Sequence, residues 1–283
     1  MTKLFTDLKS FKAHPAGAPR AAVFTMGALH AGHMELVKAA RQIVGPDGEV
    51  LLTIFVNPTQ FTKSADLASY PRTLDADLEL CAAAGVDVVL APSVEDVFAE
   101  PITQINAGLL GQVLEGVSRP AHFDAVASIV FHLLNLTRPK FTFFGEKDFQ
   151  QLAVVKHMVQ STGLPVQVVG VPTVRDANGI ALSSRNSQLS EESLLLAASL
   201  YQSLQIAQSD LAAGGEIAAA ISAAENFLIK FPGIQIDYLE VVAEDLQELS
   251  ANSSLEIGSP ARILIAAYID GVRLIDNLGV VRR

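Results

Sequence analysis

Short apolar runs alternate with segments of helical periodicity over the first 174 residues. Residues 21–24 form the first run, and in the following segment, 34–44, Leu36, Ala40 and Ile43 fall on one side of a helix. Further runs of strand length occur at residues 49–56, 86–90, 141–144 and 166–174. Helical segments separate them at residues 74–84, 125–136 and 149–160. This alternation predicts an α/β fold with a doubly wound parallel sheet.

Two local predictions concern the ends of helices in this region. Residues 1–19 alternate apolar and charged residues and then contain Pro and Gly, which predicts a short amphipathic helix followed by a turn. Asp124 precedes the helical segment 125–136 and is a predicted N-cap.

The pattern changes after residue 174. Asn178-Gly179 indicates a hairpin or tight loop. Two long segments rich in Ala and Leu, 191–213 and 216–231, keep a helical period, and strand-like segments follow at 234–242, 262–268 and 272–275. We therefore predict two domains, a doubly wound domain over residues 1–174 and a smaller α+β domain over residues 175–283.

Composition narrows the class of protein. The 283 residues carry a formal net charge of −10, which argues against non-specific binding to nucleic acid or to an anionic membrane. Cys81 is the single cysteine, as expected in a reducing cytoplasm. No apolar run reaches the length of about 18 residues that a transmembrane helix needs, and the N-terminus has no continuous signal core.

The sequence TMGALHAGH, residues 25–33, places two histidines and two glycines on a predicted strand-to-helix turn. In a parallel sheet, ligands bind at such carboxyl ends of strands, and a helix N-terminus suits a phosphate. Three interpretations stay open for His30 and His33. They cap the helix or pack in the core, they bind a metal, or they donate hydrogen bonds to phosphates. The metal interpretation is the weakest, because no ligand spacing is recognisable and no metal site held by side chains is predicted.

Other polar residues follow predicted strands or lie in later loops. Lys147 comes directly after a strand, and Ser183-Ser184-Arg185 lies in a loop. Each is weak evidence alone, since a solvated loop explains it, but together they could close over a triphosphate. Gln60 and Gln151 are either surface amides or hydrogen-bonding groups for a small substrate rich in hydroxyls.

These turns resemble, in order, the motifs of one known family, the pantoate–β-alanine ligases. The matching stretches are TMGALHAGH at 25–33, FVNPTQF at 55–61, YPRT at 70–73, FGEKD at 144–148 with Gln151, SSRN at 183–186 and RLIDN at 273–277. The resemblance spans residues 20–277, whereas the His-x-Gly-His turn alone marks only a superfamily of nucleotidyltransferases.

The resemblance implies a cytoplasmic homodimer with a Rossmann-like N-terminal domain and a smaller C-terminal lid domain. It implies condensation of pantoate with β-alanine at the expense of ATP, with Mg²⁺. The ATP-contacting positions would be Met26, Gly27, Ala28, Leu29, His30, Ala31, Gly32, His33, Gly145, Glu146, Lys147, Asp148, Val174, Leu182, Ser183, Ser184 and Arg185. His33, His30, Lys147 and Arg185 would be catalytic, and Gln60 and Gln151 would bind pantoate. Whether Asp75, Asp77 or only the phosphates hold Mg²⁺ stays open.

The chain departs from the family pattern at three positions. Ala121 and Ala125 replace two glycines of the motif Arg-Pro-Gly-His-Phe-x-Gly-Val, and Asp270 stands where glycine is common. The two alanines leave the roles of Arg119 and His122 in the substrate pocket open, whereas Asp270 lies far along the chain from the proposed site motifs. The alternative functions are a related nucleotidyltransferase acting on another small acceptor and a nucleotide-binding protein without activity.

Overall fold

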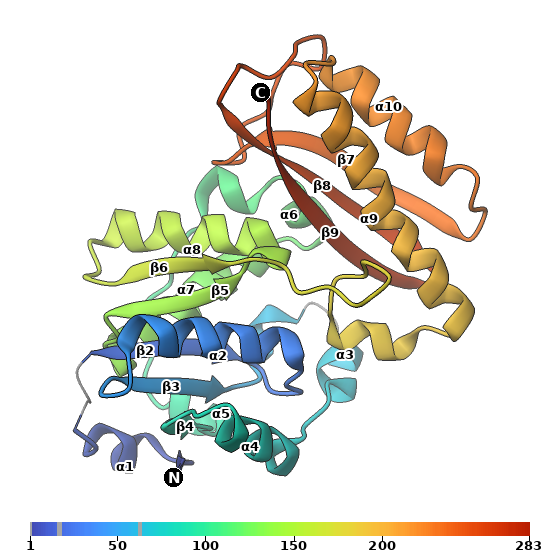
Figure 1. Cartoon of the computed structure of the whole chain (residues 1–283). Helices are drawn as coiled ribbons and strands as arrows, with labels where there is room; N and C mark the ends of the chain where they lie inside the picture. Colours follow the sequence, from blue (N-terminus) through green and yellow to red (C-terminus); the bar gives the residue numbers. More distant parts are fainter. Residues whose placement is uncertain (1, 16–18, 62–63) are drawn as a thin grey trace. The chain divides into compact units, whose positions relative to one another are not determined.

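The computed structural model describes residues 2–15, 19–61 and 64–283 and divides into two compact units (Figure 1). Unit 1 runs to Glu146 and includes Gln150–Pro172. Unit 2 comprises Lys147–Phe149 and Thr173–Arg283. The assignment of residues 1–174 and 175–283 to separate domains stays a prediction. No described helix combines the length and the apolar character needed to span a bilayer.

The sheet of unit 1 has six strands in the order β1-β4-β3-β2-β5-β6, and every pair is parallel. The strands are β1 Lys3–Phe5, β2 Arg20–Thr25, β3 Glu49–Ile54, β4 Val88–Leu90, β5 Phe141–Gly145 and β6 Gln167–Val171. From β2 the chain proceeds outward to β3 and β4, and it then returns to the other side of β2 for β5 and β6. The strand order therefore reverses between β2 and β5, where doubly wound proteins bind ligands.

Helices cover both faces of this sheet. The helices between β1 and β6 are α1 Leu8–Lys12, α2 Ala31–Val44, α3 Ser64–Ser69, α4 Leu74–Ala83, α5 Val94–Val97, α6 Glu115–Ser118, α7 His122–Thr137 and α8 Phe149–Thr162. Short 3₁₀ turns lie at η1 Pro58–Gln60, η2 Gly108–Gly111 and η3 Glu146–Asp148. In β2, Val23 packs with α2 and α4, whereas Ala22 packs with Phe11 of α1 on the opposite face. Burial on both faces explains why the strands read as continuous apolar runs, and it confirms the predicted doubly wound sheet.

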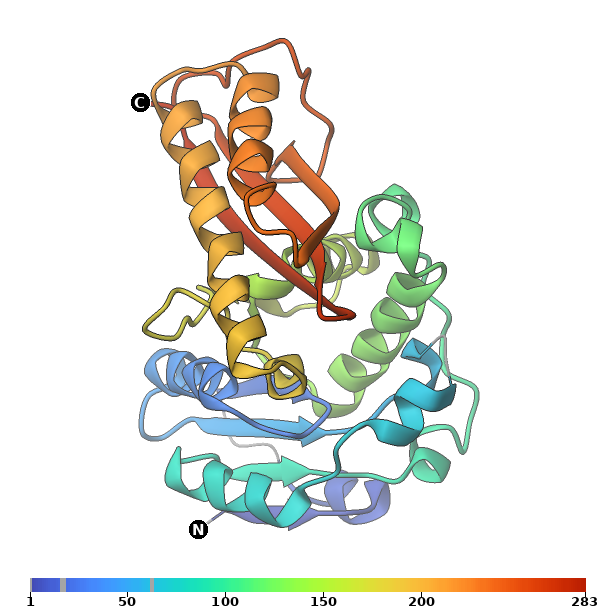
Figure 2. The same cartoon turned by 90° about the vertical axis from the view of Figure 1, so that its right-hand side faces the viewer.

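Unit 2 is an antiparallel three-stranded sheet covered by two helices (Figure 2). Its strands are β7 Ile234–Ala243, β8 Pro260–Ile269 and β9 Val272–Val281, and its helices are α9 Glu191–Ala212 and α10 Ile217–Leu228, preceded by η4 Ser184–Gln188. Alternate residues of β8, such as Ile263, Ile265 and Ala267, share one apolar core with both helices. The predicted C-terminal α+β arrangement is confirmed.

One local prediction is confirmed only in part, and another was wrong. Lys3–Phe5 form a parallel edge strand on β4, so the N-terminal helix is confined to Leu8–Lys12. The turn expected after it falls partly on residues 16–18, outside the described residues. Asp124 does not cap α7, because the helix begins at His122 with Ala121 as N-cap. The Asp124 carboxylate instead accepts a hydrogen bond from the N–H of Ala107 at 2.7 Å.

The backbone explains the departure at Asp270. Asp270 and Gly271 form the two-residue connection between β8 and β9, with φ values of +52° and +75°. Tight hairpins of this kind need positive φ at both central residues, and Asp tolerates the left-handed region better than most residues. Aspartate followed by glycine therefore suits this turn.

The two alanines that replace glycines lie in opposite backbone environments. Ala121 is exposed and left-handed, with φ +60°, whereas Ala125 lies inside the first turns of α7, where its N–H donates to the carbonyl of Ala121. A left-handed alanine costs about 1–2 kcal/mol, whereas alanine inside a helix is better than glycine by about 0.5–1 kcal/mol.

We predict that Ala121→Gly and Ala125→Gly change stability in opposite directions. Relief of the left-handed strain, less the entropy that glycine adds to the unfolded chain, should raise the unfolding free energy of Ala121→Gly by up to about 1 kcal/mol. Ala125→Gly should lower it by about 0.5–1 kcal/mol. Urea unfolding of both variants measures this, and destabilisation by Ala121→Gly would contradict the prediction.

Candidate active site

Polar turns follow three neighbouring strands at one edge of the parallel sheet. The turn that carries His30 follows β2, η1 with Gln60 follows β3, and Glu146 follows β5. Because these strands are parallel, their carboxyl ends share one edge of the sheet. The topology therefore brings the predicted histidine turn and the predicted Gln60 turn to the same side of unit 1.

The turn between β2 and α2 is held by Asp77 of α4. The two carboxylate oxygens of Asp77 accept hydrogen bonds from the N–H groups of Ala28 and Leu29, at 3.1 and 2.8 Å. Gly27 and Ala28 both have positive φ, +81° and +51°. A Cβ on Gly27 would come within 3.0 Å of an Asp77 oxygen. Gly27 is therefore required by the turn itself, and the N–H groups of Ala28 and Leu29 bind Asp77.

Asp77 is a site residue whose role the sequence did not indicate. It is 2% exposed, and it lies 48 residues from Leu29 along the chain, so spacing offers no clue to the contact. Its negative charge also acts on Cys81, where burial first and Asp77 second raise the pKa of the thiol to about 12. Because both Asp77 oxygens accept main-chain hydrogen bonds, Asp77 is a poor candidate for a Mg²⁺ ligand.

His30 and His33 form a capping box at the start of α2. His30 is the N-cap, and its Nδ1 accepts from the N–H of Gly32 at 3.1 Å, while the Nδ1 of His33 accepts from the N–H of His30 at 3.3 Å. The ring centroids lie 4.1 Å apart. A neutral imidazole that accepts at Nδ1 carries its proton on Nε2, so each ring presents a donor there. The cap interpretation and the donor interpretation are therefore compatible.

Two side chains at the start of α7 contact the main chain of Gln60, one from Arg119 just before the helix and one from His122, its first residue. Nη2 of Arg119 donates to the Gln60 carbonyl oxygen at 3.4 Å, and Nδ1 of His122 lies 3.1 Å from the same oxygen. The structure thus places both residues at the η1 turn. Their contacts fix the backbone from which the Gln60 side chain extends.

Asn57 adds a buried polar atom to the η1 turn. It is 1% exposed, and its Oδ1 accepts from the N–H and the hydroxyl of Thr59, at 3.2 and 2.9 Å. Its Nδ2 is buried and has no hydrogen-bond partner within the described part of the chain. Buried donors in native proteins are nearly always satisfied, so this amide is available to a water molecule or to a ligand.

Gln151 lies in the first turn of α8 and is half-buried. Its neighbour Gln150 has a structural role, because it donates to the carbonyls of Leu110 and Val113 at 2.7 and 2.8 Å. The predicted substrate-binding role of Gln151 stays a prediction.

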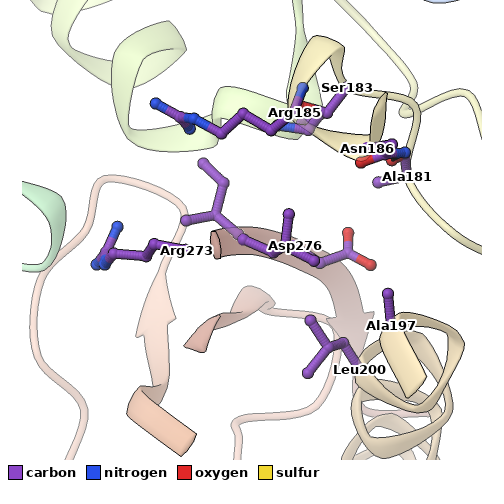
Figure 3. Close-up of a pocket in the computed structure, with 11 residues that line it drawn as sticks. Ala181, Ser183, Arg185, Asn186, Ala197, Leu200, Arg273 and Asp276 are labelled. Atoms are coloured by element: carbon purple, nitrogen blue, oxygen red, sulfur yellow. Dashed lines mark hydrogen bonds between the residues drawn. The ribbon is translucent and has the colours of Figure 1, made fainter. Parts of the chain in front are cut away.

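Unit 2 contains a pocket that collects the predicted cationic and hydroxyl residues (Figure 3). Lys147, Ser183 and Arg185 all line it. The Ser183 hydroxyl accepts from the N–H of Arg185 at 3.2 Å, which shapes the loop at η4. Arg273 of β9 also lines the pocket and pairs with Asp237 at 2.7 Å. In Figure 3, Arg185 and Arg273 lie on the side of the pocket away from Ala197 and Leu200 of α9.

Three further positions were predicted to contact ATP, namely Val174, Leu182 and Asp148. Leu182 donates its N–H to the carbonyl of Val174 at 2.9 Å, so these two residues are neighbours across the loop. Asp148 is exposed, with its carboxylate 4.0 Å from the Lys147 amine. Their predicted contacts with ATP stay predictions.

A comparison with protein-family models shows the family to which the chain belongs. The model described as pantoate-beta-alanine ligase matches residues 3–279. The chain belongs to the pantoate–β-alanine ligase family. Among curated relatives of this family, the chain is 47% identical over 259 residues to a pantothenate synthetase of Nocardioides sp., covering 90% of this chain and 76% of the relative. A pantothenate synthetase of Salinispora arenicola is 46% identical over 91% of this chain and 89% of its own length.

Solved structures of the family are also similar. The crystal structure of pantothenate synthetase from Thermus thermophilus is 41% identical, covers 98% of this chain and 99% of its own, and has a TM-score of 0.90. The ligase from Francisella tularensis, described as complexed with beta-gamma ATP and beta-alanine, is 31% identical with a TM-score of 0.78, and the match covers 98% of this chain and 97% of that one. These findings confirm the predicted family and fold, and they support the ligase rather than the nucleotidyltransferase alternative.

The Asp77 contacts predict a specific effect of substitution. In Asp77→Asn the amide nitrogen would face one of the two N–H groups, so one charge-assisted hydrogen bond is lost and the other becomes neutral. We expect the unfolding free energy to fall by about 1.5–3 kcal/mol and ATP to bind more weakly, because the turn loses its support.

Asp75→Asn is the matched control, because Asp75 is an exposed carboxylate in the same helical turn. Its effect should stay within about 0.5 kcal/mol. Urea unfolding and equilibrium ATP binding measure both variants. Equal effects of the two substitutions would show that Asp77 does not hold the turn.

Proposed function

We propose that this chain condenses (R)-pantoate with β-alanine to pantothenate through a pantoyl-adenylate intermediate, with release of AMP and pyrophosphate. The observation that carries the proposal is the set of polar turns at the carboxyl ends of β3, β2 and β5, which belong to the family motifs. The family match over residues 3–279 and the related ligase described with beta-gamma ATP and beta-alanine support ATP as a substrate.

In the first step, a carboxylate oxygen of pantoate attacks the α-phosphorus of ATP. A bond from that oxygen to phosphorus forms, the bond from phosphorus to the bridging oxygen breaks, and pyrophosphate leaves. A carboxylate is already ionised at pH 7, so this step needs no general base. It needs hydrogen-bond donors and cations around the phosphorus and the leaving group.

The proposed donors are the Nε2–H groups of His30 and His33, because the Nδ1 atoms of both rings serve the helix cap. Lys147, Ser183 and Arg185, which line one pocket of unit 2, are assigned to the phosphates. The other proposed ATP contacts are Met26, Gly27, Ala28, Leu29, Ala31, Gly32, Gly145, Glu146, Asp148, Val174, Leu182 and Ser184.

Pantoate is assigned to Gln60 and Gln151. The buried amide of Asn57, with its unsatisfied Nδ2, is a further donor for a substrate oxygen at the η1 turn. Arg119 and His122 serve this subsite by holding the carbonyl of Gln60.

In the second step, the neutral amine of β-alanine attacks the acyl carbon of pantoyl adenylate. The carbon–nitrogen bond forms, the bond from the acyl carbon to the AMP oxygen breaks, and AMP leaves. We assign no side chain as the base for the amine, so its proton passes to solvent or to a phosphate oxygen.

Mg²⁺ is proposed as part of the MgATP substrate. Within the described ranges, no group of three or more His, Cys, Asp or Glu side chains could hold a metal ion. Mg²⁺ commonly keeps its waters and binds through substrate phosphates, so it requires no such cage. A homodimer and a cytoplasmic location are also proposed, on the resemblance to the family alone.

The two-step scheme predicts an exchange reaction. With pantoate and MgATP but without β-alanine, labelled pyrophosphate should appear in ATP, because the first step is reversible. Omission of pantoate is the control and should abolish the exchange. An absolute requirement for β-alanine would contradict the adenylate intermediate.

The two functions of His33 predict different effects for two substitutions. A glutamine at this third position of the helix can still accept the capping hydrogen bond, but it lacks the imidazole. We expect His33→Gln to keep most of the stability and to lose about 10²–10³-fold in kcat. His33→Ala should lose similar activity and, in addition, about 1 kcal/mol of stability.

Steady-state turnover and urea unfolding of both variants measure these effects. Near-normal turnover of His33→Gln would restrict His33 to the helix cap.

A further inference from the structure

The main chain of Lys147 is held by a side chain 130 residues away. Nδ2 of Asn277 donates to the Lys147 carbonyl oxygen at 2.9 Å, and Asn277 is 3% exposed. Asn277 ends the motif RLIDN of residues 273–277, to which the ligase mechanism assigns no role. Both residues belong to unit 2.

The orientation of the Asn277 amide is fixed by a second contact. Its Oδ1 accepts from Nη1 of Arg262 at 3.2 Å. A guanidinium can only donate, so the oxygen of the amide must face Arg262 and the nitrogen must face the Lys147 carbonyl.

The backbone that carries Asn277 is anchored by an ion pair between the half-buried Arg175 and the buried Asp276. Arg175 binds the carboxylate of Asp276 with both terminal nitrogens, at 2.6 and 2.8 Å, and also donates to the carbonyl of Asn277 at 3.1 Å. The guanidinium of Arg175 lies 3.8 Å from the ring centroid of Tyr201. Such a bidentate, stacked arginine leaves Asp276 and Asn277 little freedom to move.

A second contact holds the segment Lys147–Phe149 at Phe149, two residues after Lys147. The guanidinium of Arg262 lies 4.0 Å from the ring centroid of Phe149. Arg262 therefore contacts both the Asn277 amide and the Phe149 ring. These contacts join Lys147–Phe149 to unit 2, whereas the residues on either side belong to unit 1.

We propose that Asn277, the last residue of the RLIDN motif, is a positioning residue for Lys147. The proposal rests on the proposed contact of Lys147 with the phosphates. A shift of the Lys147 backbone displaces its amine, and a misplacement of about 1 Å in a reacting group can cost about 10²-fold in rate. Asn277 touches no reacting atom in this scheme and acts only through Lys147.

Asn277→Asp tests this proposal. The carboxylate keeps the size of the amide and an acceptor for Arg262, but it cannot donate to the Lys147 carbonyl. Gln208→Glu is the matched control, because Nε2 of Gln208 donates to the carbonyl of Gly279 on the same strand at 2.6 Å. Each substitution turns one amide donor to a main-chain carbonyl into a carboxylate.

Both substitutions are made in the full chain and again in a Lys147→Ala background. In the unmodified background, Asn277→Asp should raise the dissociation constant of ATP at least severalfold and lower kcat by about 10–100-fold. In the Lys147→Ala background it should change either quantity less than about twofold, because residues that act through one another are not additive. Gln208→Glu should leave both quantities nearly unchanged in both backgrounds.

An equal loss in the two backgrounds would overturn the proposal, since it would indicate general damage to the fold. So would normal ATP binding and turnover of Asn277→Asp. Thermal unfolding checks that each variant is folded, and Asn277→Ala, which adds no charge, replaces the aspartate if that variant does not fold. If the unmodified chain made no pantothenate, the proposed function would fail, but the ATP-binding comparison would still test Asn277.

Discussion

The contact of one buried carboxylate with two main-chain N–H groups sets the geometry of the histidine turn. Gly27 and Ala28 are consecutive residues with positive φ, and such backbone persists only where its surroundings over-determine it. Asp77 supplies that constraint through its bonds to Ala28 and Leu29. The dependence is mutual, because a buried carboxylate needs strong donors in return. Where α2 begins, and so where His30 lies, follows from this turn.

In the proposed mechanism, stability and chemistry use different atoms of the same histidines. The cap occupies the Nδ1 lone pairs of His30 and His33 and thereby selects the tautomer with a proton on Nε2. A general base would need its lone pair directed at the substrate, whereas these rings use theirs in the cap. Adenylation by an ionised carboxylate needs donors and no base. The local structure of the helix start therefore matches the requirement of the proposed first step.

Most of the architecture was predictable, because the central strands are buried on both faces and read as apolar runs. The edge strand Lys3–Phe5 was not, since three residues with a single neighbour carry little signal. Contacts between distant segments were also missed. The turn at Ala28 was recognised from its glycines and histidines, but its partner Asp77 lies on another helix. Lys147 was recognised as a candidate from its place after a strand, whereas its contact with Asn277 spans 130 residues.

At position 121 the chain keeps a left-handed backbone without a glycine. Ala121 keeps the left-handed conformation that glycine adopts without strain, at a cost of about 1–2 kcal/mol. It lies between Arg119 and His122, and both of these residues contact the single carbonyl oxygen of Gln60. A regular helical or extended residue at position 121 would direct the two side chains differently. The strained turn is therefore what brings both donors to one atom beside the proposed pantoate subsite, and strain retained at such a place indicates a functional constraint.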